Sequence, residues 1–161
     1  MSPAWLSLGS NLDNPVKQIK TAIATIKRLQ TIDFIKTSSL YSSKAWGNIA
    51  QADFVNAVVK IKTSLTPFEL LAQCRQLEDQ QQRVRHKRWG PRTLDIDILL
   101  IDDVVMDAKK LTIPHPFMHE RAFVLVPLAE ISKNIMVPGH NKTAYELMRR
   151  TDSAGIKKLA R

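Results

Sequence analysis

The distribution of apolar and polar residues predicts strands and helices that alternate along the chain. The alternating residue pattern at 4–8 is typical of a half-buried strand, whose successive side chains point to opposite faces. A helix should follow, because Asn14 is a good N-cap residue and Pro15 suits the first helical position. The apolar stripe of this helix consists of Val16, Ile19, Ile23 and Ile26. Residues 32–42 have the composition of a second strand.

A further strand and a second helix are predicted in the middle of the chain. Residues 54–62 alternate, which gives a strand with two distinct faces. One face has Val55, Ala57, Val59 and Ile61, and the other has Phe54, Asn56 and Val58. Thr66 and Glu69 form a capping box that starts a helix running to about residue 82.

The last third of the chain is predicted to hold shorter elements. After a buried strand at 92–101, residues 104–107 are expected to return as its hairpin partner. Residues 118–121 suggest a helical turn and 143–150 a last helix, while the basic tail to residue 161 should be loosely held.

This order of elements predicts an α/β (α+β) fold. The succession β-α-β-β-α-β is closest to a ferredoxin-like arrangement, with a largely antiparallel sheet flanked by helices. Long active-site loops are expected at 42–53 and 83–92, where apolar periodicity is missing. The length suits a single domain over residues 1–161. The phosphate-binding P-loop motif and the dinucleotide fingerprint are both missing from the sequence.

Composition limits the cellular compartment and the binding partners that can be expected for the protein. The formal charge of +9 suits a polyanion, such as nucleic acid, an anionic membrane surface or nucleotide phosphates. The single cysteine, Cys74, forbids an internal disulfide and suggests a reducing compartment. We find neither an apolar run near 18 residues nor a signal-peptide pattern, so a cytoplasmic protein without a membrane partner is expected.

The main chemical candidate is the strand that carries Asp95 and Asp97. Its apolar face is expected to contain Leu94, Ile96, Ile98 and Leu100. The two carboxylates then share the other face, where each must be desolvated and each repels the other. Five basic residues precede them: Arg83, Arg85, Lys87, Arg88 and Arg92. Magnesium ions on the aspartates, with a nucleotide phosphate chain between the metals and the arginines, would satisfy all these charges.

Other interpretations of these residues remain open. The aspartates could form a solvated acidic pair with nearby arginines, and the basic run could be a nucleic-acid surface that includes Trp89. The adjacent carboxylates oppose the second interpretation, because they repel a phosphate backbone unless metals intervene. A nucleotide sensor without catalytic activity is a third possibility. Phe54 could stack on a flat heterocycle, and Asn56 could form hydrogen bonds with it. His115 has a restrained backbone because it lies between two prolines.

Residues 89–100, Trp-Gly-Pro-Arg-Thr-Leu-Asp-Ile-Asp-Ile-Leu-Leu, resemble the signature of the 6-hydroxymethyl-7,8-dihydropterin pyrophosphokinases of folate biosynthesis. Weaker similarities follow the family order over essentially the whole chain, at 8–12, 54–57, 83–85 and 114–123. The resemblance implies transfer of pyrophosphate from ATP, the co-substrate, to the hydroxymethyl-dihydropterin, which yields AMP and the pterin diphosphate. It also implies two Mg²⁺ ions. We expect a monomer that has no nucleic-acid partner.

The resemblance also implies roles for particular residues. The expected catalytic residues are Arg83, Arg92, Asp95 and Asp97, and the same two aspartates would hold the metals. The expected ATP-binding residues are Glu78, Arg85, Trp89, Arg92, Ile98, Leu111, Thr112, His115 and Arg121. The expected pterin-binding residues are Ser43, Ala45, Trp46, Phe54, Asn56, Asp95 and Phe123. The sequence departs from many family members at Lys44 and Ala45, where they have prolines.

Overall fold

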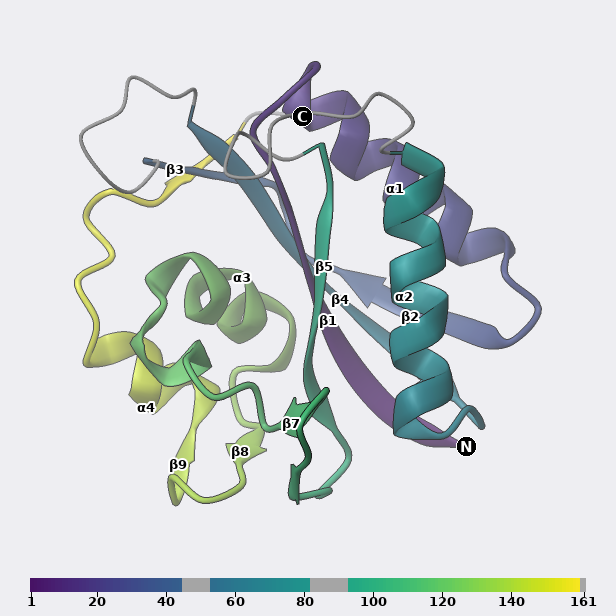
Figure 1. Ribbon diagram of the computed structural model, residues 1–161. Helices are drawn as coiled ribbons and strands as arrows, with labels where there is room; N and C mark the ends of the chain where they lie inside the picture. Colours follow the sequence, from purple (N-terminus) through teal and green to yellow (C-terminus); the bar gives the residue numbers. More distant parts are fainter. Residues whose placement is uncertain (45–52, 82–92, 160–161) are drawn as a thin grey trace.

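The computed structural model describes residues 1–44, 53–81 and 93–159 and is built on an antiparallel sheet. The strand order is β10-β3-β4-β1-β5, and β2 pairs with β4 beside β3 (Figure 1). The strands of this sheet are β1 (Ser2–Ser10), β2 (Ile32–Thr37), β3 (Tyr41–Ser43), β4 (Phe54–Thr63), β5 (Asp95–Ile101) and β10 (Lys157–Lys158).

Helices cover both faces of the sheet (Figure 1). The first pair, α1 (Pro15–Arg28) and α2 (Pro67–Gln81), packs on one face, and α3 (Ala122–Ser132) with α4 (Ala144–Arg149) packs on the other. With β2 and β3 counted as one interrupted strand, β1 to β5 follow the ferredoxin-like order. The predicted fold class is therefore confirmed.

Short elements connect β5 to the helices on the second face. They are β6 (Met106–Asp107), β7 (Thr112–Ile113), a 3₁₀ helix (Met118–Glu120), β8 (Met136–Val137) and β9 (Lys142–Thr143). None of the helices in the described part of the chain is long and apolar enough to cross a lipid bilayer.

The predicted helix starts are confirmed by their capping bonds. The Asn14 side chain accepts a hydrogen bond from the Lys17 N–H, as an N-cap residue should. The Thr66 N–H donates to Glu69 Oε1 at 2.8 Å, and the Glu69 N–H donates to Thr66 Oγ1 at 3.2 Å. This reciprocal capping box satisfies two backbone donors that the helix itself cannot use.

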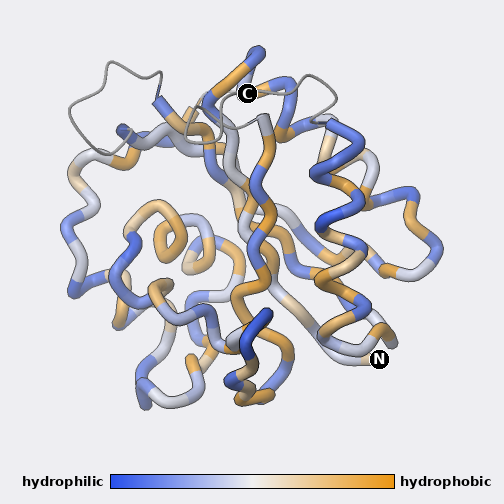
Figure 2. Tube along the Cα trace, viewed as in Figure 1, coloured by the Kyte–Doolittle hydropathy of each residue, from blue (hydrophilic) through white to orange (hydrophobic). Residues whose placement is uncertain are grey.

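The sheet separates two apolar cores. Val55, Ala57, Val59 and Ile61 of β4 point toward α1 and α2, as predicted, whereas Val58 points toward α3 and α4. Figure 2 shows the apolar positions along the central strands and α3 as orange segments. Each central strand therefore contributes to both cores through its alternating side chains.

The expected position of Leu100 is wrong, because β5 contains a β-bulge. Leu6 pairs with Ile98 and Trp5 with Leu100, so the register skips Leu99. An extra residue reverses the alternation beyond it. Leu94, Ile96 and Ile98 lie in the core under α1 and α2, but Leu99 and Leu100 lie under α3 and α4.

Three other expectations are corrected. The strand predicted at 32–42 is divided into β2 and β3, because Ser38 turns inward and its Oγ accepts a hydrogen bond from the Val58 N–H. Met106 pairs with Ile113 of β7 and not with β5. The basic tail is paired with the sheet, since Lys157 opposes Ser42 and the Leu159 N–H donates to Leu40 O at 2.8 Å.

Leu125→Ala should lower the free energy of unfolding by about 2–5 kcal/mol, because Leu125 of α3 is fully buried in the core between the sheet and the helices α3 and α4, and its truncation leaves a cavity. Denaturant titration followed by circular dichroism measures this change. Val105→Ala is the matched control, since Val105 is 73% exposed. Equal stability of the two variants would contradict the assigned core.

Candidate active site

A cleft of about 1250 Å³ lies on the α3 side of the sheet. Its floor is formed by β1, β4 and β5, and its walls come from residues 117–124 and 150–156. The floor residues are Ser7, Leu8, Gly9, Phe54, Asn56, Asp95 and Asp97. The strands thus bring together side chains from distant parts of the chain.

The described residues that were expected to bind a pterin all line this cleft. They are Ser43, Phe54, Asn56, Asp95 and Phe123. Asn56 is only 6% exposed, and its Nδ2 donates to Ser43 Oγ at 2.7 Å. Gly9 lies opposite Asn56 on β1, where an added Cβ would approach Asn56 Oδ1 to 3.4 Å. The polar edge of Asn56 is therefore fixed in direction beside a half-buried aromatic ring, that of Phe54.

Asp95 and Asp97 both line the cleft, as their two-residue spacing on β5 predicts. The Asp97 side chain is 42% exposed, so its oxygens can reach a ligand. In residues 1–44, 53–81 and 93–159, no group of three or more His, Cys, Asp or Glu side chains is arranged to hold a metal. Two carboxylates suit Mg²⁺, which takes most of its remaining ligands from phosphates and water.

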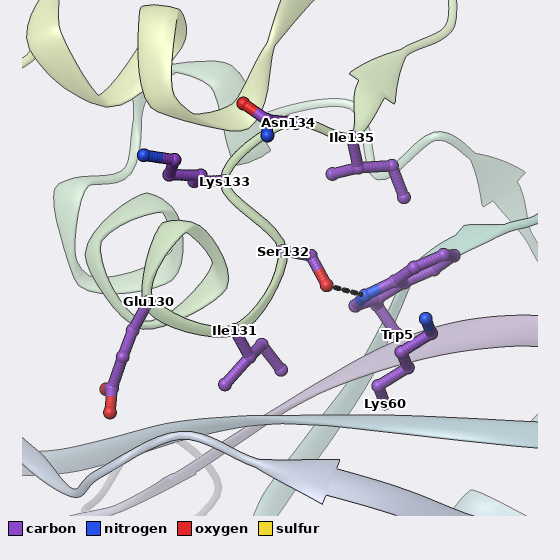
Figure 3. A pocket seen from close by; sticks show the side chains of 8 residues that line it. All are labelled: Trp5, Lys60, Glu130, Ile131, Ser132, Lys133, Asn134 and Ile135. Atoms are coloured by element: carbon purple, nitrogen blue, oxygen red, sulfur yellow. Dashed lines mark hydrogen bonds between the residues drawn. The ribbon is translucent and has the colours of Figure 1, made fainter.

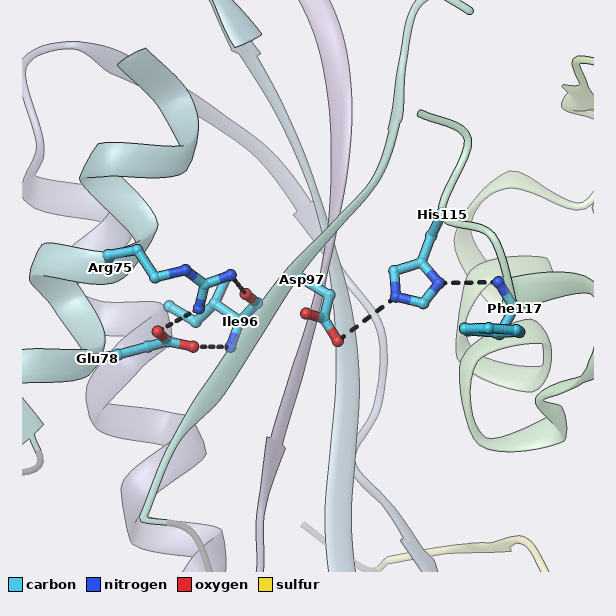
Figure 4. Close-up of polar contacts among 6 residues, drawn as sticks. All are labelled: Arg75, Glu78, Ile96, Asp97, His115 and Phe117. Carbon is cyan, nitrogen blue, oxygen red and sulfur yellow. Dashed lines mark hydrogen bonds and ion pairs between the residues drawn. The ribbon is translucent and has the colours of Figure 1, made fainter. Parts of the chain in front are cut away.

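His115 is held next to Asp97 by its own backbone and by its neighbour (Figure 4). The His115 N–H donates to Leu99 O at 2.9 Å, and His115 Nδ1 accepts from the Phe117 N–H at 3.2 Å. The neutral ring must then carry its proton on Nε2, which lies 4.0 Å from Asp97 Oδ2. Burial lowers the pKa of His115, the Asp97 charge opposes this, and the Arg121 charge adds to it.

Arg121 adds a positive charge to the cleft wall. Its guanidinium carbon lies 5.5 Å from the ring centroid of Phe117 and 5.7 Å from that of Phe123. Contact with two aromatic rings restricts the guanidinium while leaving its N–H groups available for an anion.

The other described residues that were expected to bind ATP lie along the outer edge of β5 and not in the cleft. Glu78, on α2, accepts a hydrogen bond from the Ile96 N–H at 2.7 Å through Oε2. The side chains of Ile98 and Leu111 are buried in the core, and Thr112 belongs to β7, which contacts β5. The described members of the two predicted sets of ligand-binding residues therefore flank the same pair of aspartates.

Some predicted site residues cannot be placed, and some cleft residues were not predicted. Ala45, Trp46, Arg83, Arg85, Trp89 and Arg92 lie outside the described residues. The unpredicted wall includes Arg150, Thr151, Asp152, Gly155 and Ile156, which run toward β10. The strand β10 has only two residues, too few for an alternating apolar and polar pattern. The sequence therefore could not predict this part of the wall.

A smaller pocket of about 500 Å³ lies beyond the end of α3 (Figure 3). Trp5 and Lys60 line it from the sheet, and Trp5 Nε1 donates to Ser132 Oγ at 2.9 Å. None of the residues predicted for catalysis or binding lines this pocket. The candidate chemistry thus concentrates in the larger cleft and at the adjoining edge of β5.

The sequence profile of the 7,8-dihydro-6-hydroxymethylpterin-pyrophosphokinase (HPPK) family matches residues 5–133. The chain belongs to this family. It is 47% identical over 138 residues to the 2-amino-4-hydroxy-6-hydroxymethyldihydropteridine pyrophosphokinase of Haemophilus influenzae, with 86% of each chain covered. The enzyme of the same name from Methylorubrum extorquens is 38% identical over 159 residues, and 99% of each chain is covered.

Solved HPPK structures have the same fold. Wild-type Plasmodium falciparum HPPK-DHPS with SDX-DHP superposes with a TM-score of 0.73 at 16% identity over 98% of this chain. A second crystal structure of the wild-type protein gives 0.71 at 17% identity over 92%. This HPPK chain spans about half the length of those proteins, 47% and 41% respectively. At such identities the likeness shows the fold alone.

The titration midpoint of His115 should lie below its usual pKa of 6.5 in the metal-free HPPK, because burial disfavours the imidazolium ion. Asp97→Asn should lower the midpoint further, since it removes the charge that favours protonation. NMR of the ring nitrogens measures both values. His140, whose pKa is lowered by burial and by His119, is the internal control. A higher His115 midpoint in Asp97→Asn would contradict this arrangement.

Proposed function

We propose that the cleft binds the pterin, that the outer edge of β5 binds ATP, and that Asp95 and Asp97 act where the two meet. HPPK enzymes transfer pyrophosphate from ATP to 6-hydroxymethyl-7,8-dihydropterin in folate biosynthesis. The position of the two aspartates supports this assignment of sites, because they lie between the two sets of residues. The reaction needs that juxtaposition, since pyrophosphate passes directly from one substrate to the other.

Asp95 and Asp97 would together hold two Mg²⁺ ions. Bound Mg²⁺ neutralises charge on the phosphate chain as it is transferred. The carboxylate oxygens are hard ligands on one face of one strand, and they line the cleft. The chain's own contribution is to keep these two oxygen donors in a fixed direction next to the pterin site.

The pterin would be placed by aromatic stacking and by hydrogen bonds to the side-chain amide of Asn56. Phe54 and Phe123 line the cleft from β4 and α3, and Asn56 projects from the same strand as Phe54. The hydrogen bond from Asn56 to Ser43 fixes the amide, which can then select one edge of the heterocycle. Ala45 and Trp46 are proposed to complete this site by resemblance to the family.

The phosphates would be bound by a set of cationic and polar groups. Arg121 lines the cleft and His115 lies beside Asp97, while Arg83, Arg85, Trp89 and Arg92 are proposed by resemblance. Glu78, Ile98, Leu111 and Thr112 would contact the nucleotide along β5. Guanidinium groups suit this task, because their paired N–H donors match phosphate oxygens. We further propose that the protein acts as a cytoplasmic monomer.

The rival proposal is a basic nucleic-acid-binding module. The formal charge of +9 is compatible with it. The cleft instead presents two carboxylates beside aromatic rings, and a phosphate backbone would be repelled by those carboxylates. A pyrophosphokinase site accounts for both the acidic and the basic groups.

Product analysis tests the proposed function. A mixture of the protein, ATP, Mg²⁺ and 6-hydroxymethyl-7,8-dihydropterin should give AMP and the pterin diphosphate in equal amounts. Attack at the β-phosphorus leaves AMP, whereas an ordinary kinase releases ADP. Chromatography separates these products. Stoichiometric ADP with a pterin monophosphate would refute the assignment, and so would the same turnover with EDTA in place of Mg²⁺.

Asp97→Ala should lower turnover at least about 100-fold, because metal-assisted charge stabilisation contributes several kcal/mol to phosphoryl transfer. The variant should remain folded, since removing one of two mutually repelling carboxylates relieves repulsion. Steady-state rates and thermal unfolding measure the two effects. Asp103→Ala, at an exposed position just after β5, is the matched control and should keep the parent rate. A parental rate in Asp97→Ala would exclude the metal role.

A further inference from the structure

Arg75 and Glu78 of α2 make an unusual contact with β5. Glu78 Oε2 accepts a hydrogen bond from the Ile96 N–H at 2.7 Å, and Arg75 Nη2 donates to Ile96 O at 3.2 Å (Figure 4). The two side chains are also joined, because Arg75 Nη1 donates to Glu78 Oε1. A closed ring of hydrogen bonds therefore links one turn of α2 to one residue of β5.

The position of Ile96 gives this contact its consequence. The Ile96 N–H belongs to the peptide unit that joins Asp95 to Ile96, and the Ile96 carbonyl belongs to the unit that joins Ile96 to Asp97. Both peptide units between the two aspartates are therefore held by α2. Each aspartate thus has one of its two flanking peptide units held by α2. Because the flanking peptide units set the direction in which a side chain leaves the strand, this contact constrains the directions of both carboxylates.

The remaining geometry supports an orienting contact. β5 is the last strand in the sheet order of the described residues, and both Ile96 backbone groups bond to α2 side chains. Glu78 is only 7% exposed, so its charge would be costly without these partners. Arg75 can bond Glu78 and Ile96 at once because its guanidinium presents N–H groups in a fixed fork.

We propose that Arg75, acting together with Glu78, is a positioning residue that aligns Asp95 and Asp97 through the backbone of Ile96. The inference rests on the metal role proposed above for the aspartates, and it gives Arg75 a role that none of the expected site residues covers. Arg75 does not line the cleft, so it acts on the site only through β5. Partners of this kind typically change metal affinity or activity by about 10–100-fold when they are removed.

Arg75→Met removes the fork and keeps a long apolar side chain. The control is Gln76→Met, the same replacement one position later on α2, at an exposed residue whose hydrogen bond is to Gln73 on the same helix. Calorimetry with a non-hydrolysable ATP analogue should show Mg²⁺ binding about 10–100-fold weaker in Arg75→Met than in the control. Binding of the same analogue in EDTA should be equal in the two variants.

Two further measurements separate alignment from general damage. Amide hydrogen exchange at Ile96 should be several-fold faster in Arg75→Met, because Glu78 loses the partner that orients it. Arg75→Met should unfold at a lower temperature than Gln76→Met, because the buried Glu78 carboxylate loses its charged partner, but it should be fully folded at the temperature of the binding measurement, which thermal unfolding checks. Arg75→Lys should give an intermediate Mg²⁺ affinity, because an ammonium group keeps the charge but not the fork.

The outcomes distinguish this inference from the proposed function. If the parent binds Mg²⁺ and the Met variants at 75 and 76 bind it equally, the positioning role is wrong and the metal site stands. Equal weakening with and without Mg²⁺ would make Arg75 a nucleotide contact and would also overturn the inference. If the parent with the ATP analogue does not bind Mg²⁺, both proposals fall.

Discussion

The site depends on keeping two like charges close together on an otherwise apolar strand. Asp95 and Asp97 cost desolvation and repulsion, while Ile96 and Ile98 on the opposite face of β5 are buried under α1 and α2. Burial of the isoleucines holds the strand in register, and the open cleft leaves the carboxylates accessible to a cation. The energy that stabilises the fold thus also offsets the unfavourable placement of the two charges. A strand covered tightly on both faces could not serve this purpose.

The position of β5 in the sheet explains how two substrates could reach the same carboxylates. On one side the strand borders β1 and β4, whose Gly9, Asn56 and Phe54 form the floor of the cleft. On its other side the backbone bonds to Glu78 and Arg75 of α2 and to His115. An interior strand would have β-strands along both edges. The last strand of the order instead offers one edge to side chains and to loop backbone.

The sequence predicts the parts of this arrangement that repeat and misses the parts that depend on single contacts. Alternation in 54–62 and at Asp95 and Asp97 fixes which side chains share a face, and the residues at Asn14 and Thr66 mark where helices begin. The bulge at Leu99 cannot be read from the pattern, because Ile98 to Ile101 is apolar throughout and suits either face. The pairing of Lys157 with Ser42 likewise joins residues whose local sequence carries no strand pattern. Arg75 resembles any polar residue on an exposed helix until the fold brings it to Ile96.

The irregularities missed in the sequence serve the site more directly than the regular elements do. Leu99 is the residue that the β1–β5 register skips, and its carbonyl accepts the His115 N–H. The His115 ring is then oriented by the Phe117 N–H, so that Nε2 faces Asp97. The β5 backbone is thus bonded on both sides of Asp97: Ile96 bonds to Arg75 and Glu78 of α2, and Leu99 bonds to His115. Regular pairing with another strand would have occupied the same backbone groups without bringing any side chain toward the carboxylates. The outer edge of β5, with which no other strand of the described residues pairs, is therefore what allows helix side chains to bond the Ile96 backbone between the two aspartates and the His115 ring to face Asp97.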